Sequence, residues 1–557
     1  MHLAKHQLLR LISFLIVAGS LLGIVWIPKP SQASNGAGAT PSPIPFTDLN
    51  PLGANFFLER EVEPWKREQT VKMAKEAGIG WIKQMFVWEE IEPKKGYFFD
   101  DKFKKSTWEK YDDIVSLAER YGMRIIARLD RPPAWTRKDN SYATAPPDKL
   151  EDYANFVKTV VTRYKGRVQY YQVWNEPNIW PEWGDKPVDP AGYVAMLKLA
   201  ATAAREADPN VVILAAPLAE TLEESPRNLS ELKYLEAMYK AGAKGYFDVL
   251  SVNAYGFEYP PDAPPDPNIL NFSRVQLLRD VMLQQGDSDK AIWFNEFGWN
   301  ASPPDFPANK LVWRRVSEEQ QATYTADAIR LARSWGWVGV INIWYFRQVG
   351  DIPIDQSDYF FRVVDTDFVP RLVYFKLKDL GQELRVAGQG AYEESNPAVE
   401  PQGSWHGRRL DVASGQRLLQ SPDKDCSVTF TINGTALHLT VLAGRDSTRL
   451  HVTVDGKDPG LSRQEPGVGS IIDLPPSDSS ALVKTTVITG LSSGKHTIKL
   501  EYVSGAAWAF DTFEVENRPA TTPFWGLVLA TLIGLAGLIA SLVLRRKRDL
   551  PSPGFTA

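Results

Sequence analysis

The sequence predicts a (β/α)8 barrel of the TIM type followed by an all-β sandwich, and three observations support this. Between residues 47 and 386, eight short apolar runs alternate with amphipathic helical stretches, the pattern of a parallel α/β fold. No glycine-rich phosphate loop follows the first run, which disfavours the alternative of an open, doubly wound sheet. From 405 to 517, alternating strand patterns separated by Gly and Asp turns replace the helices.

The eight runs are apolar, aromatic and β-branched, as expected of buried strands. Helical patterns such as 148–165 and 193–207 lie between them. The fourth run ends in the phrase VWNEPN, where Pro177 has no N–H to donate to a strand partner. The predicted strands begin near residues 53, 81, 124, 168, 211, 247, 291 and 339.

Length and composition limit the possible functions. A chain of 557 residues is too long for one ordinary domain. A net charge of -4 gives no electrostatic case for nucleic acid as a partner. The single cysteine, Cys426, excludes an intrachain disulfide framework, and its place in a strand pattern indicates a small core residue. No cluster of His, Asp or Asn predicts a metal site, and no cofactor is expected.

Both ends of the chain are hydrophobic. Residues 1–33 combine basic residues, an apolar run and a small-residue cleavage site, which predicts a signal peptide or, alternatively, an uncleaved anchor. A flexible linker, 34–46, follows. Residues 524–544 carry no charge and at about 1.5 Å per residue would span about 31 Å, enough for a membrane. The basic start of the tail, 545–557, predicts a cytoplasmic end, with the preceding domains outside the cell.

The region between the two folded domains, 387–404, has the composition of a linker. The domain at 405–517 contains the phrases HVTVDGK (451–457), LSSGKHTIKLEYVSG (491–505) and FDTFEV (510–515). By these phrases it resembles carbohydrate-binding β-sandwiches of the galactose-binding-like type. Trp405 and Trp508 are possible ligand platforms there. The alternative is that this domain is a spacer that holds the barrel above the membrane.

Two glutamates occupy equivalent places in the predicted barrel. Glu176 follows the fourth strand and Glu296 the seventh, each directly after an Asn and beside aromatic residues. The strands of such a barrel all end on one face, where active sites are built. Two opposed carboxyls suit cleavage of a glycosidic bond, in which one donates a proton while the other attacks or activates water. The sequence therefore predicts a glycosidase site at this face.

The barrel resembles the clan A glycoside hydrolases, nearest to families 39 and 5. The phrases WEEIEPKKGYFFD (88–100), VWNEPN (173–178), FNEFGW (294–299) and IWYF (343–346) carry this resemblance. It implies a retaining, double-displacement mechanism with Glu176 as acid/base and Glu296 as nucleophile. It further implies that Asn175 hydrogen-bonds the sugar 2-hydroxyl, that Tyr255 orients the nucleophile, and that Trp344 forms the aromatic floor under the cleaved sugar.

Two departures from the family pattern concern the substrate. Asn253 stands where many relatives carry His in a His-x-Tyr step, so the hydrogen bonding around the nucleophile is expected to differ. The third strand ends in RLDRPPAW, with charges where relatives are often less charged. Arg131 could bind an acidic sugar, or it could form a structural ion pair with Asp130 or another carboxylate.

Further tryptophans lie at strand ends, where aromatic rings can pack on the apolar faces of sugars. Trp88, Trp135 and Trp299 are accordingly candidate substrate contacts, with core packing as the alternative. The layout predicts a cell-surface retaining β-glycosidase that acts on an extracellular oligo- or polysaccharide. The alternatives are a glycan-binding protein without catalysis and a transglycosylase that uses the same two glutamates.

Overall fold

The structure is a computed structural model of the 557-residue chain. It describes residues 44–421, 424–443, 446–474, 476 and 481–517, together with 531–533, 535–536 and 539–540. The predicted signal segment 1–33, the tail 545–557 and most of the predicted membrane helix 524–544 lie outside the described residues. Within the described ranges, no helix has the length and apolar character needed to cross a membrane.

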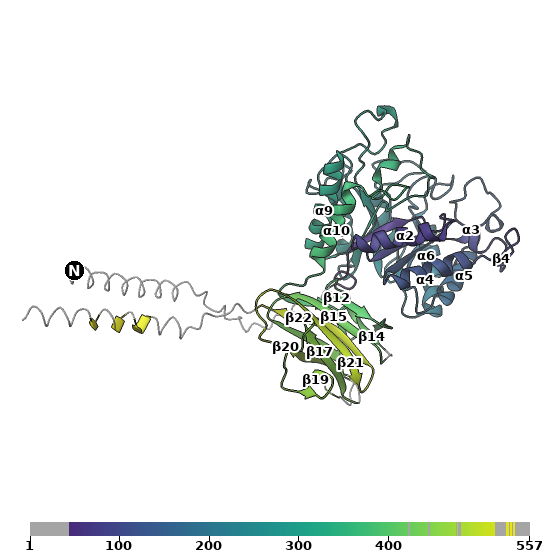
Figure 1. Cartoon of the computed structure of the whole chain (residues 1–557). Helices are drawn as coiled ribbons and strands as arrows, with labels where there is room; N and C mark the ends of the chain where they lie inside the picture. The colour runs from purple at the N-terminus through teal and green to yellow at the C-terminus, as the bar shows by residue number, and fades with distance from the viewer. Residues whose placement is uncertain are drawn as a thin grey trace, which may run out of the picture.

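The first domain is a closed parallel barrel, as predicted from the alternation of strands and helices (Figure 1). All eight predicted strands are present, and each pairs with its neighbours in the order β1-β10-β9-β8-β7-β6-β5-β2. The barrel strands are β1 (Leu52–Phe56), β2 (Trp81–Val87), β5 (Arg124–Asp130), β6 (Tyr170–Val173), β7 (Val212–Leu214), β8 (Val249–Tyr255), β9 (Ala291–Gly298) and β10 (Val338–Ile343).

Helices surround the barrel because each carries one apolar face that packs on the strands. In α5, for example, the buried residues include Tyr153, Val157 and Val161, which share one helix face. A short hairpin of β3 (Phe99–Asp100) and β4 (Lys105–Ser106) lies in the loop after α3. The helices are α2 (Pro64–Glu76), α3 (Trp88–Ile91), α4 (Glu109–Arg120), α5 (Leu150–Arg163), α6 (Pro190–Ala207), α7 (Glu231–Lys240), α8 (Val275–Gln284), α9 (Glu318–Ser334) and α10 (Leu372–Leu384).

The barrel interior is filled at its N-terminal end and polar at its C-terminal end. Inward-facing residues such as Trp81, Ile126 and Trp293 form one buried apolar cluster at the N-terminal end. Phe46 packs against this cluster, and its carbonyl accepts a hydrogen bond from the Trp293 indole at 2.9 Å. Residues 44–46 therefore close the barrel, and the prediction that the linker extends to residue 46 is wrong for these three.

The second domain is a sandwich of two antiparallel sheets with a common core, lying below the barrel in Figure 1. Phe430 of one sheet contacts Phe510 of the other, with ring centroids 5.6 Å apart. One sheet contains β11 (Gly390–Glu393), β13 (His406–Arg409), β14 (Arg417–Ser421), β16 (Ala436–Leu442), β20 (Leu482–Ile488) and β22 (Trp508–Glu516). The other contains β12 (Val399–Gln402), β15 (Ser427–Asn433), β17 (Thr448–Val454), β18 (Gln464–Glu465), β19 (Gly469–Leu474) and β21 (Lys495–Ser504).

The prediction of a linker at 387–404 is wrong for its strand-forming parts. β11 pairs with β22, and β12 pairs with β15, so this segment contributes a strand to each sheet. The error has a physical reason: neither strand has the apolar alternation of a half-buried strand, since most of their residues are partly or fully exposed. Pairing to a long, apolar neighbour holds them in place instead.

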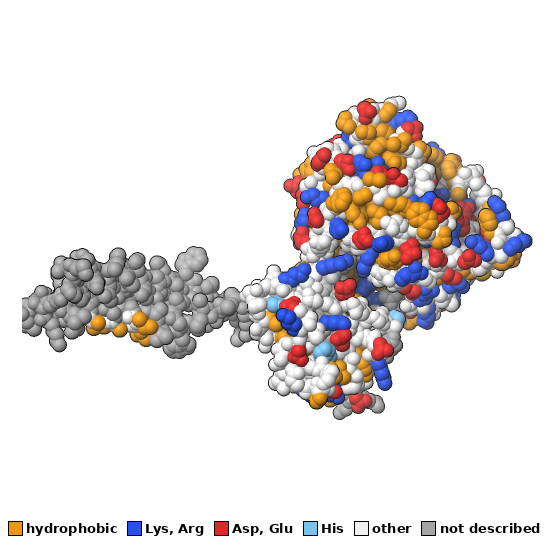
Figure 2. Space-filling view, viewed as in Figure 1, with side chains coloured by type: hydrophobic (Ala, Val, Ile, Leu, Met, Phe, Trp, Pro, Cys, Tyr) orange, Lys and Arg blue, Asp and Glu red, His pale blue; other side chains and the backbone are white. Residues whose placement is uncertain are grey.

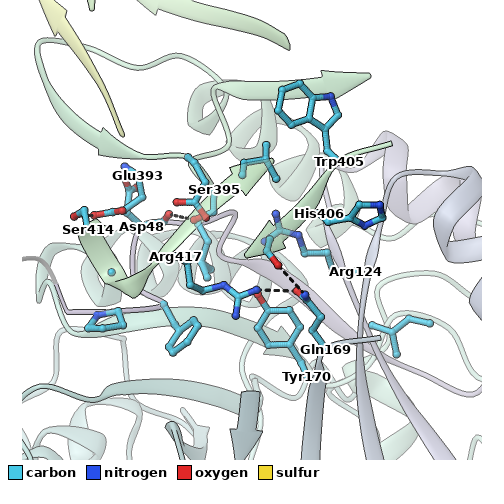
Figure 3. A pocket seen from close by; sticks show the side chains of 18 of the residues that line it. Asp48, Arg124, Gln169, Tyr170, Glu393, Ser395, Trp405, His406, Ser414 and Arg417 are labelled. Carbon is cyan, nitrogen blue, oxygen red and sulfur yellow. Dashed lines mark hydrogen bonds between the residues drawn. The ribbon is translucent and has the colours of Figure 1, made fainter. Parts of the chain in front are cut away.

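The two domains meet at the N-terminal end of the barrel through a polar junction (Figure 3). The Asp48 carboxylate accepts hydrogen bonds from the Glu393 backbone N–H and from the Asn396 side chain, both at 2.7 Å. Arg417 donates to the Gln169 side chain at 2.9 Å across the same junction. These bonds join residues far apart in the sequence, and they attach the sandwich to the end of the barrel opposite the predicted site.

Candidate active site

The two predicted catalytic glutamates lie together at the C-terminal end of the barrel. Glu176 follows β6, and Glu296 lies within β9, so each is carried by the rigid sheet. Both residues line one cavity of about 260 Å³. This volume is below the range of about 300–1,000 Å³ typical of pockets for drug-sized ligands, so it suits a single sugar ring.

The loop that carries Glu176 has an unusual backbone. Trp174 and Glu176 have positive φ angles of 73° and 37°, a region that side-chain-bearing residues rarely adopt. The Glu176 backbone N–H donates to the Pro217 carbonyl at 3.0 Å, which fixes the loop to the end of the neighbouring strand. Strained backbone of this kind persists where the surrounding structure holds it, and it aims the Glu176 side chain into the cavity.

Three donors surround the Glu296 carboxylate. The Tyr255 hydroxyl lies 2.9 Å from Oε2, while Lys83 Nζ and Asn295 Nδ2 each lie 3.4 Å from Oε1. Burial lowers the pKa of Lys83 to about 8, against the opposing attraction of Glu296, so the ammonium remains charged at neutral pH. Three donors aimed at its oxygens suit the role of a nucleophile, which attacks with an oxygen lone pair.

Glu176 has a different environment. Asn253 Nδ2 donates to Oε1 at 2.5 Å, and Asn175 Nδ2 lies 3.4 Å from Oε2. Burial, followed by the negative charge of Glu296, raises the pKa of Glu176 to about 8. The group therefore holds its proton at neutral pH, as a general acid must. Two carboxyls in contrasting environments are the arrangement that separates acid from nucleophile.

The Asn253 departure from the family pattern thus has a visible consequence. Its amide nitrogen contacts Glu176, and its amide oxygen accepts a hydrogen bond from Asn295 at 3.1 Å. Because Asn295 also contacts Glu296, one chain of hydrogen bonds joins the two carboxyls. A neutral amide at this position cannot acquire a charge, unlike the histidine that stands there in many relatives.

Three other predicted binding residues line the cavity with the glutamates: Asn175, Tyr255 and Trp344. The Trp344 indole is partly exposed and meets Phe57 edge to face at 5.9 Å. Trp313, which was not among the predicted residues, also lines the cavity and packs on Tyr255 with ring centroids 4.6 Å apart. The cavity therefore combines aromatic faces with polar groups, as sugar recognition requires.

Sequence reasoning also missed the charged residues of the barrel interior. Lys83 on β2 and Arg128 on β5 both line the cavity, and Arg128 Nε pairs with Asp130 Oδ2 at 2.6 Å. A signal was present: Lys83 lies two residues after the buried Trp81, and Arg128 two residues after Ile126, so strand alternation places all four side chains toward the barrel axis. Glu182, from the loop after β6, also lines the cavity.

Comparison with known proteins finds sequence similarity in the N-terminal part of the barrel. A family model for cellulase, glycosyl hydrolase family 5, matches residues 47–228. Residues 47–228 are therefore part of a glycoside hydrolase domain. A 6-phospho-beta-glucosidase from Clostridium longisporum is 29% identical over 115 residues, which span 20% of this chain and 23% of that relative. The predicted resemblance to clan A glycoside hydrolases is confirmed.

Solved structures of glycoside hydrolases are similar to this chain at low sequence identity. A family 39 glycoside hydrolase from Bacteroides cellulosilyticus WH2 is 18% identical, with 82% of this chain and 81% of that chain covered and a TM-score of 0.47. A GH39 enzyme from Xanthomonas axonopodis pv. citri is 15% identical, with 83% and 95% covered and a TM-score of 0.43.

Three tryptophans of the barrel domain lie elsewhere than predicted. Trp88 is 0% exposed, stacks on Phe156 at 4.9 Å and donates to Glu92. Trp299 is 1% exposed and donates to the Tyr259 carbonyl. The prediction that these two contact substrate is wrong, because their rings point outward into the packing between strands and helices.

Trp135 also lies outside the cavity. It is half-buried, meets Trp88 edge to face at 5.8 Å, and donates to the Glu92 carbonyl at 3.0 Å. These contacts fix the indole against the loop after β2. Its predicted contact with the sugar ring in the cavity is therefore not formed by this arrangement.

Proposed function

We propose that the protein is a retaining β-glycosidase in which Glu296 is the nucleophile and Glu176 the acid/base. The observation that carries this proposal is the contrast between the two carboxyls. Donors from Tyr255, Lys83 and Asn295 contact the Glu296 carboxylate, whereas burial keeps the proton on Glu176 at neutral pH.

The proposed reaction has two displacements. Glu296 attacks the anomeric carbon while Glu176 protonates the departing glycosidic oxygen, which gives a covalent glycosyl-enzyme and a free alcohol. Glu176, now ionised, then removes a proton from water as the water oxygen attacks the same carbon and releases Glu296. The Tyr255 hydroxyl, whose pKa burial holds well above its ordinary value, stays protonated and keeps its hydrogen bond to Glu296.

Relatives support a β-linked substrate. The curated relative is a 6-phospho-beta-glucosidase, and one similar structure is a beta-xylosidase from Caulobacter crescentus CB15.

We further propose that the protein acts at the cell surface, with 524–544 as the membrane anchor and the barrel outside. The absence of charge over that segment and the basic residues after it support this orientation. An oligo- or polysaccharide outside the cell would then be the substrate.

The test compares the full-length protein with Glu176→Gln and Glu296→Gln on a panel of aryl β-glycosides and polysaccharides. We expect kcat/KM to fall by about three or more orders of magnitude in both variants. The exposed Glu258→Gln serves as the matched control, with activity close to that of the wild type. Proton NMR of the first product, before mutarotation, should show the β-anomer.

Azide separates the two roles. Azide should restore activity to Glu296→Ala by giving an α-glycosyl azide, and to Glu176→Ala by giving the β-glycosyl azide. Binding of glycans without turnover in the wild type would show a receptor instead. Products longer than the substrate would show a transglycosylase that uses the same residues.

A further inference from the structure

Four cationic side chains line the active-site cavity, and three of them are paired. Arg60 forms an ion pair with Asp351, Lys83 lies 3.4 Å from Glu296, and Arg128 lies 2.6 Å from Asp130. Arg131 lines the same cavity, yet it has no ion pair with any carboxylate in the described part of the chain. Asp130, the structural partner that the sequence offered for Arg131, is instead bound to Arg128.

The backbone holds Arg131 in this position. Its φ angle is 58°, in the left-handed region, directly after β5 ends at Asp130. The Arg131 carbonyl accepts a hydrogen bond from the Glu89 backbone N–H at 2.9 Å, and two prolines, Pro132 and Pro133, follow. Non-glycine residues rarely adopt this conformation, and those that do cluster at active sites and ligand-binding loops.

Two carboxyls lie near Arg131 without pairing with it. Burial has the largest effect on the pKa values of Glu182 and Glu89 and raises both, while the positive charge of Arg131 lowers them. The face of the protein seen in Figure 2 carries acidic and basic side chains side by side.

On the premise of the glycosidase function above, we propose that Arg131 binds an anionic group on the sugar ring in the cavity and thereby selects acidic sugars. A guanidinium presents a planar fork of donors that matches a carboxylate or a phosphate with two parallel hydrogen bonds. The sugar would therefore be a uronic acid or a sugar phosphate. Its ring would lie against Trp344, beside Glu176 and Glu296.

The test uses the full-length protein and four aryl β-glycosides: the glucuronide, its methyl ester, the 6-phosphoglucoside and the neutral glucoside. We expect the wild type to prefer one of the two anions over the glucoside by about 10- to 100-fold in kcat/KM. Arg131→Gln should remove that preference, and Arg131→Lys should keep part of it. The methyl ester should behave as the glucoside does if the carboxylate is the group bound. Arg120→Gln, an exposed arginine on α4, is the control.

Either of two results would overturn the inference while leaving the glycosidase intact. One is a wild type that cleaves the glucoside with a higher kcat/KM than either anionic glycoside and loses this activity in both Glu176→Gln and Glu296→Gln. The other is a preference for an anion that Arg131→Gln leaves unchanged. If no glycoside is cleaved, the proposed function fails, and calorimetry with free glucuronate and glucose 6-phosphate decides on Arg131. Binding lost in Arg131→Gln would support the anion site, and no binding to the wild type would refute it.

Discussion

Replacing Glu176 with Gln should stabilise the protein, and the gain should grow with pH. The pKa of this carboxyl is about 8 in the folded protein against 4.5 for the unperturbed group, because burial and the charge of Glu296 oppose ionisation. Between these two values the folded state binds more protons than the unfolded state. The free energy of unfolding therefore falls as pH rises from about 4.5 to about 8.

The size of the effect follows from the shift. A difference of about 3.5 units at about 1.36 kcal/mol per unit gives an upper limit of about 5 kcal/mol. We expect a gain of about 2–3 kcal/mol, about half of that limit. Gln has nearly the same shape and never ionises, so the variant avoids this cost above pH 8 and shows little advantage near pH 4.5.

Thermal and urea unfolding of the wild type and Glu176→Gln, at intervals from pH 4.5 to 8.5, measures this difference. The two stability curves should meet at low pH and separate towards pH 8. The exposed Glu258→Gln should follow the wild type throughout. Parallel curves for wild type and Glu176→Gln would mean that Glu176 is not held protonated by its site, and the assignment of the general acid would lose its basis.

Further predictions concern the contacts of the nucleophile, the cavity and the junction. Lys83→Met should lower kcat/KM by about 10- to 100-fold because Glu296 loses the ammonium group 3.4 Å away. The control Lys158→Met removes an exposed ion pair with Glu206 and should leave kcat/KM within about twofold of the wild type. Tyr255→Phe should lower kcat/KM about 10-fold through loss of the 2.9 Å hydrogen bond, with unchanged circular dichroism. Trp313→Ala should raise KM for aryl glycosides severalfold; an unchanged KM would remove Trp313 from the binding surface. Asp48→Ala should separate the melting of the two domains in calorimetry, since two hydrogen bonds across the junction are lost; a single unshifted transition would contradict this.

The barrel could be predicted because its strands are continuous apolar runs, buried on both faces, such as Val249–Tyr255. The two glutamates could be predicted because strand ends fix where residues lie along the barrel axis. The direction of a side chain after a strand ends is not fixed in this way. Trp88 and Trp299 turn outward and Trp344 inward, although all three follow a strand or end it.

Charged residues inside strands were the other gap between sequence and structure. Lys83 pairs with Glu296, which is far away in the sequence, and Arg128 pairs with Asp130 at the end of the same strand. Pairing of Lys83 with Glu296 joins β2 to β9 across the barrel, and no local pattern encodes such a contact. The polar strands β11 and β12 were not predicted for a similar reason, because pairing with β22 and β15 stabilises them.

The closure of the barrel by Phe46 limits where a shortened version of this protein can begin. The Phe46 carbonyl occupies the space that a side chain at Gly339 would need, 2.1 Å from the position of a Cβ atom there. An expression variant that starts at Thr47 would leave the Trp293 indole without its acceptor and open the apolar cluster to water. Truncations should retain Ile44 onward, and substitution of Gly339 should be as damaging as removal of the residues that cover it.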